Sequence, residues 1–157
     1  ERIDRGQDHA VFVDHPTSRH ALVSTLAGLR RLTPGRLVVL AEARTAARLA
    51  ADGAARDAGA GAFERAVLER ADECVVVPDT LMHDAAAAGD VLAYARIDRL
   101  LAGLAGADCL LVLGDARLRR HTPTDPGGEP MPLTAVVDGW LQLANEPQPW
   151  GPARRAA

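Results

Sequence analysis

The chain of 157 residues contains no lysine, so all 18 of its basic residues are arginines. Without lysine, no side-chain amine is available to hold a nucleotide phosphate or to form a Schiff base. The 21 acidic residues give a net charge of -3, and the isoelectric point is near 5.9. This balance lacks the positive charge that binding to nucleic acid requires, so we expect no nucleic-acid partner.

Aromatic residues and cysteines are also scarce. Aromatics make up 3% of the chain, and much of its 48% apolar content is alanine, so leucine, valine and alanine must build the core. Cys74 and Cys109 each lie in an apolar run, which favours buried reduced thiols over a disulfide or a metal site. No apolar run approaches the roughly 18 residues of a membrane-spanning helix. We therefore expect no membrane insertion, no metal site at the cysteines and a cytoplasmic location.

The clearest local pattern runs from residue 10 to residue 31. An apolar strand over residues 10–13 ends in Asp14, and a polar turn follows. Thr17 or Ser18 is placed to cap a helix that continues to about Leu32. This order of strand, loop and helix delivers an acidic residue to the loop, so a functional site would begin here.

The rest of the chain continues the alternation of strands and helices. The pattern predicts strands at residues 36–40, 73–77, 91–95 and 108–113, and helices at residues 62–70, 83–88, 97–104 and 134–144. Alanine-rich residues 41–58 predict an irregular connection, and residues 119–132 a long loop rich in proline and glycine. We therefore expect one α/β domain over residues 1–144, with a three-layer, mostly parallel sheet, and a proline-rich tail over residues 145–157.

Ligands of such sheets bind beyond the carboxyl ends of the strands. The strand ends predicted here carry acidic residues: Asp14, Glu42, Asp79, and Asp115 after Gly114. Two interpretations stay open. Each carboxylate can serve a turn or a helix cap, or together they can form an acidic edge that holds Mg²⁺ or orients an amine.

The opening, ERIDRGQDHAVFVDHPTSRHALVSTLAGLRRLTPGRLVVL, resembles the start of the carboxy-terminal domain of the Mur ligases. The closest branch is the one that adds the third residue of the peptidoglycan stem peptide. Later, ERADECVVVPD resembles the family's ADVVVVTDD strand, and DCLLVLG resembles the strand that leads to the family's GKGHE motif. The resemblance implies a Rossmann-like domain that closes over a nucleotide while an upstream domain carries the phosphate loop.

The resemblance also implies which positions would face the ligands. The Asp of the family's DYAHxP motif matches Asp14, but its His falls on Thr17 and its Pro on Arg19. Glu42 and Arg44 stand where the family has a glycine-rich stretch.

The later motifs of the family match this chain less well. The amino-acid-binding DNPR signature falls on residues 81–83, where His83 and its neighbours supply no Arg. Within GKGHE, Gly114 is retained, but Asp115 replaces the Lys and so reverses the charge beside an anion.

These substitutions predict a Mur-ligase-like domain that is not catalytic by itself and has a structural or partner-binding role in peptidoglycan synthesis or cell division. The alternative is the closing domain of an active ATP-dependent amide ligase with altered amine specificity. A third interpretation is an unrelated doubly wound domain. We assign no catalytic residue and no cofactor to this domain alone, and ATP and Mg²⁺ only if an upstream domain is active. Expected partners are upstream domains of the same protein, and a protein bound through residues 119–132 or through Trp150 in the tail.

Overall fold

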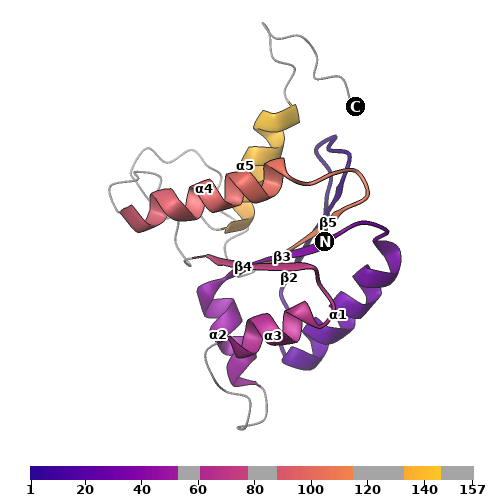
Figure 1. The fold of residues 1–157 in the computed structure, drawn as a ribbon, viewed down its shortest axis with the longest axis vertical. Coiled ribbons are helices and arrows are strands. Elements are labelled where there is room, and N and C mark those ends of the chain that lie inside the picture. The colour runs from indigo at the N-terminus through magenta and orange to yellow at the C-terminus, as the bar shows by residue number, and fades with distance from the viewer. Residues whose placement is uncertain (53–60, 78–87, 115–132, 146–157) are drawn as a thin grey trace, which may run out of the picture.

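The computed structural model describes residues 1–52, 61–77, 88–114 and 133–145. These residues form a mixed α/β fold of five helices and one five-stranded, mostly parallel sheet (Figure 1). The predicted α/β class and the mostly parallel sheet are confirmed. None of the described helices is both long and apolar enough to cross a bilayer.

The last strand along the chain occupies the middle of the sheet. The strands are β1 (Arg2–Ile3), β2 (Ala10–Asp14), β3 (Leu37–Glu42), β4 (Glu73–Val77) and β5 (Cys109–Leu113), in the order β1-β2-β5-β3-β4. β1 pairs antiparallel with β2, and all other pairs are parallel. Every residue of β5 is buried, as expected of a strand that is covered on both faces.

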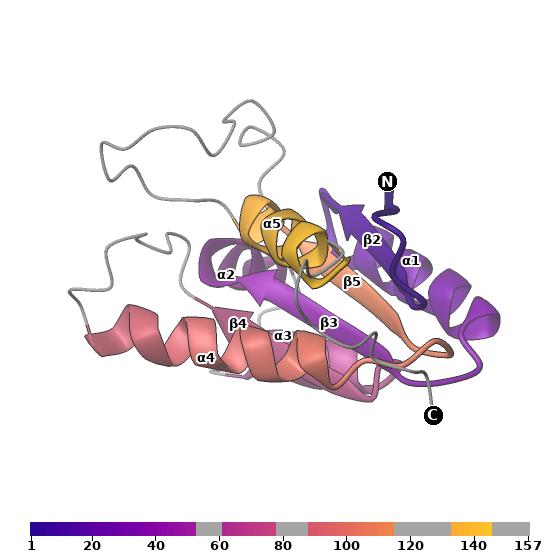
Figure 2. The same ribbon diagram turned by 90° about the horizontal axis from the view of Figure 1, so that it is seen from above.

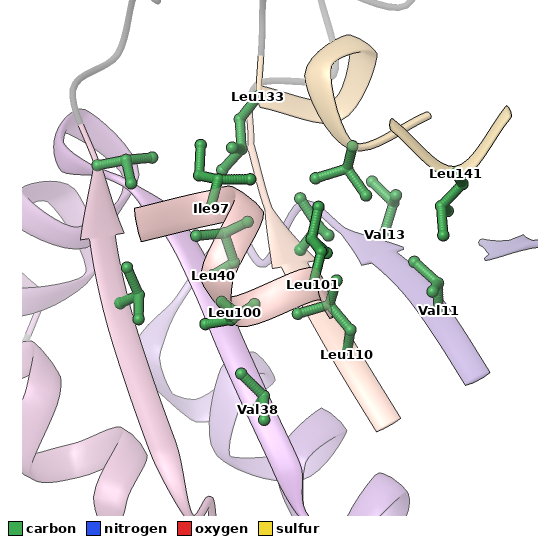
Figure 3. Packing of buried hydrophobic residues seen from close by; sticks show 14 residues of the cluster. Val11, Val13, Val38, Leu40, Ile97, Leu100, Leu101, Leu110, Leu133 and Leu141 are labelled. Carbon is green, nitrogen blue, oxygen red and sulfur yellow. The ribbon is translucent and has the colours of Figure 1, made fainter. Parts of the chain in front are cut away.

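The helices divide between the two faces of the sheet (Figure 2). Helices α1 (Arg19–Leu32), α2 (Ala43–Ala51) and α3 (Ala62–Leu68) pack on one face, and α4 (Ala88–Ala102) and α5 (Leu133–Asn145) pack on the other. Because side chains alternate along a strand, Val38 and Leu40 contact the α4 and α5 side (Figure 3), whereas Val39 lies among the residues of α1 to α3. Each face therefore has its own apolar cluster.

Local capping follows the prediction for α1. The Ser18 side chain accepts a hydrogen bond from the backbone N–H of Ala21 at 3.1 Å, and the helix ends at Leu32, directly before Thr33. This bond satisfies one of the N–H groups that have no partner within the helix. The start of α1 is therefore set by a residue of the turn that precedes it.

Two predictions of local structure are wrong. Residues 43–51, expected to be irregular, form α2, because Thr45, Ala46 and Leu49 bury a narrow face of small side chains against the sheet. Residues 91–95, expected to form a strand, lie inside α4; an apolar run of this length fits either structure. Residues 2–3, for which no strand or helix was predicted, form β1. Residues 83–87 of a predicted helix, the 119–132 loop and the tail lie outside the described residues.

Two aspartates hold the amino end of β3. Asp72 accepts hydrogen bonds from the backbone N–H of Leu37 at 2.7 Å and from the Arg30 guanidinium at 2.6 Å. Asp108 accepts one from the backbone N–H of Arg36 at 2.8 Å. The bond from Leu37, followed by the bond from Arg30, lowers the pKa of Asp72. Burial acts to raise the pKa of Asp108, but the bonds from Arg36 and Ala105 outweigh burial and lower it.

These lowered pKa values predict a loss of stability in acid. A carboxylate whose pKa is lower in the folded chain contributes its full stabilisation above the unfolded value near 4, and loses it as the pH falls through the folded value. We expect the free energy of unfolding, measured in urea at pH 7, 5 and 3, to fall mainly below pH 4. Asp72→Asn should flatten this decrease, whereas Asp98→Asn, at an exposed position on α4, should leave it unchanged. An equally steep decrease in Asp72→Asn would contradict the assignment.

Candidate site at the carboxyl edge of the sheet

The carboxyl ends of the parallel strands meet at one edge of the sheet. In the strand register, Asp14 and Ala41 both pair with Leu113, and Glu42 pairs with Val77. Gly114, directly after β5, therefore lies between the ends of β2 and β3. The structure thus brings together three of the predicted site residues: Asp14, Glu42 and Gly114.

Asp14 uses both of its carboxylate oxygens within the chain. Oδ1 accepts a hydrogen bond from the backbone N–H of His15 at 2.8 Å. Oδ2 accepts one from the hydroxyl of Thr25, on α1, at 2.8 Å. The half-buried carboxylate thereby fixes the turn after β2 and ties α1 to the strand that precedes it.

His15 connects this turn to β5. Its Nδ1 hydrogen-bonds the backbone carbonyl of Gly114. A carbonyl can only accept, so Nδ1 carries the hydrogen. The other ring nitrogen, Nε2, is buried and has no hydrogen-bond partner among the described residues. The imidazole therefore holds the end of β5 through one nitrogen.

Glu42 is buried at the end of β3, with 3% of its surface exposed. Its Oε1 accepts a hydrogen bond from the backbone N–H of Leu133, the first residue of α5, at 3.3 Å. A Cβ added at Gly114 would lie 3.3 Å from the same oxygen. The carboxylate thus sits against Gly114 and at the positive end of the α5 dipole, where negative charge is stabilising.

The remaining predicted residues lie on the periphery or outside the described part. Thr17 is exposed in the β2–α1 turn, and Arg44 is exposed on the first turn of α2. Sequence reasoning missed Arg48, whose guanidinium donates to the carbonyls of Pro16 at 2.7 Å and Thr17 at 3.2 Å. No local signal marks Arg48, because residues 41–58 were expected to be irregular and its partners belong to the β2–α1 turn. The other candidates, Asp79, His83 and Asp115, lie outside the described residues.

The cysteines are free thiols away from this edge, as the sequence predicts: Cys109 is buried and Cys74 is half-buried. Burial, together with the nearby Glu64, raises the pKa of Cys74 to about 12, and burial also raises the pKa of Cys109. Both thiols therefore stay protonated at neutral pH and are poor nucleophiles.

Within the described ranges, no three His, Cys, Asp or Glu side chains are grouped so that they could hold a metal ion. The carboxylates at the edge are engaged in hydrogen bonds within the chain. Comparisons of the chain with protein-family models, with curated proteins and with solved structures give no significant match.

Proposed function

We propose that the chain is a three-layer, Rossmann-like domain of the Mur-ligase carboxy-terminal type that has no catalytic activity of its own. Its role is structural or partner-binding, in peptidoglycan synthesis or cell division. The proposal starts from the resemblance of residues 1–40 to that domain and from the replacement of the family's ligand-binding residues. The observation that carries it is the state of the carboxyl edge, where the polar side chains that remain bind other parts of the chain.

Asp14 is the residue that the family resemblance places toward a nucleotide, and both of its oxygens are engaged by His15 and Thr25. An intramolecular hydrogen bond contributes on the order of 1 kcal/mol, so freeing Asp14 for a ligand would cost roughly twice that amount. Glu42 is likewise buried against Gly114 and α5. These contacts favour a structural role for the edge over binding of a nucleotide.

The alternative is the closing domain of an active ATP-dependent amide-forming ligase, with ATP and Mg²⁺ held by an upstream domain. Two carboxylates at one edge, Asp14 and Glu42, support it because an acidic site would suit a cationic amine. Exposed Arg44 and Thr17 lie close by in the chain. In this alternative, the domain would bind a cationic amine instead of an amino acid whose carboxylate the family's lost pocket would hold.

Two matched variants in the native protein that carries this chain separate these functions. Thr25→Val removes the hydrogen bond between Thr25 and Asp14, and Asp14→Asn replaces it by a weaker bond between neutral groups, so the free energy of unfolding should fall by about 1 kcal/mol or less in each variant. We expect neither variant to change nucleotide affinity in calorimetry or ATP-dependent formation of an amide product. Amide formation that is lost in Asp14→Asn but retained in Thr25→Val would establish the closing-domain function and exclude the non-catalytic one.

A further inference from the structure

We infer that His15 and Glu42 act together as a clamp that holds the start of α5 against the end of β5. Through this clamp, the docking of α5 on the sheet depends on the β2–α1 turn at the neighbouring strand end. The inference concerns a conformational coupling within the domain and holds whether or not the proposed function is correct.

The clamp consists of three contacts in series across three strand ends. His15, after β2, binds the carbonyl of Gly114, after β5. The Glu42 carboxylate, at the end of β3, lies so near Gly114 that a Cβ added there would be 3.3 Å from Oε1. Glu42 in turn accepts the N–H of Leu133 at the start of α5. Gly114 is thus hydrogen-bonded by His15 and lies beside the carboxylate of Glu42.

Tight packing makes these contacts interdependent. A Cβ at Gly114 would lie 3.3 Å from Glu42 Oε1 and 3.4 Å from Thr134 Cγ2, so there is little free space around this backbone. If the bond to His15 is lost, the Gly114 peptide can rotate, and the position of Glu42 is no longer defined from that side. Closely packed groups with shared neighbours show non-additive effects when both are changed.

A separate attachment in the middle of α5 supplies the control. The Arg5 guanidinium binds Asp138 on α5 through two hydrogen bonds, Nε to Oδ1 at 2.7 Å and an Nη2 bond to Oδ2 at 2.9 Å. These groups are partly exposed and touch neither His15 nor Glu42 in the contacts above. Arg5→Gln therefore weakens the docking of α5 without acting on the clamp.

The test is amide hydrogen exchange in the intact chain, measured residue by residue by NMR. His15→Ala and Glu42→Met each remove one hydrogen-bonding group of the clamp and should each lower the protection of the α5 amides about tenfold relative to those of β5. In the double variant, the protection of the α5 amides should be no lower than in the more strongly affected single variant. His15→Asn should restore protection, because its amide nitrogen can occupy the place of Nδ1 and donate to Gly114.

Arg5→Gln combined with His15→Ala should instead lower protection by the product of the two single effects. If the effects of His15→Ala and Glu42→Met multiply in the double variant, the two contacts act independently and the clamp is overturned. Unchanged α5 protection in either single variant would overturn it as well. A uniform loss of protection across the sheet and all helices would show that both contacts stabilise the whole fold rather than the docking of α5. That result would also overturn the clamp.

Discussion

Replacing Gly35 by alanine should lower the free energy of unfolding by about 3 kcal/mol, the upper range for forcing an extra methyl group into a packed site. Gly35 lies in the turn before β3, where its N–H donates to the Ala107 carbonyl at 2.9 Å. An added Cβ would lie 2.5 Å from Asp108 Oδ1 and 2.6 Å from the Ala107 carbonyl oxygen. Because the second obstacle is backbone, the clash is relieved only if β3 and β5 move apart at their amino ends.

Gly28 provides the matched control. It lies on the exposed side of α1, and nothing lies within 4 Å of the Cβ that alanine would add. Alanine is the better helix former, so Gly28→Ala should raise stability by about 0.5 to 1 kcal/mol. Urea unfolding followed by far-UV circular dichroism measures both variants. A loss under about 1 kcal/mol for Gly35→Ala would show that the close approach is not rigid.

Asp108→Ala should have a comparable effect, a loss of about 3 kcal/mol, because it leaves two backbone donors at a nearly buried position without an acceptor. The residue is 7% exposed and accepts the N–H groups of Arg36 at 2.8 Å and Ala105 at 3.1 Å. It also binds the Arg36 guanidinium at 2.9 Å. One carboxylate thus joins the turn before β5 to the start of β3.

Further variants separate the backbone contacts from the ion pair. Asp108→Asn keeps one acceptor oxygen and should lose less than Asp108→Ala. The Arg36 side chain is 48% exposed, so solvent screens its pair with Asp108, and Arg36→Gln should cost about 1 kcal/mol or less. Equal losses for Arg36→Gln and Asp108→Ala in urea unfolding would mean that the ion pair, rather than the backbone donors, accounts for the effect.

The sequence predicts those elements whose signals are local. The buried strands stand out as continuous apolar runs, and Ser18 marks the start of α1 because a cap needs only its own turn. The prediction fails for α2, whose buried face of Thr45, Ala46 and Leu49 contrasts weakly with the alanines around it. No local signal marks β1, because its two residues pair with β2 only through tertiary structure.

The candidate site divides in the same way. Asp14 and Glu42 could be placed at the ends of strands, because strand and carboxylate are both visible in the sequence. The hydrogen-bond partners of these carboxylates could not be predicted, because Thr25 meets Asp14 and Leu133 meets Glu42 only once α1 and α5 are packed. The link from His15 to Gly114 joins residues 99 positions apart and depends on the strand order. The sequence therefore indicates where a functional site could lie, and the packing shows that the two carboxylates there already form hydrogen bonds within the chain.

The central position of β5 governs how the chain can fold. β2 and β3 belong to the first 42 residues, yet they are not neighbours, because each pairs with β5. During synthesis, the N-terminal part must therefore wait for residues 109–113 before its sheet can form. Pairing over such sequence separations is slow, and the unpaired edges of β2 and β3 stay open to incorrect partners until then. A chain that ends before Cys109 would lack the strand that joins the β1–β2 pair to the β3–β4 pair, so the five-stranded sheet forms only once β5 is present.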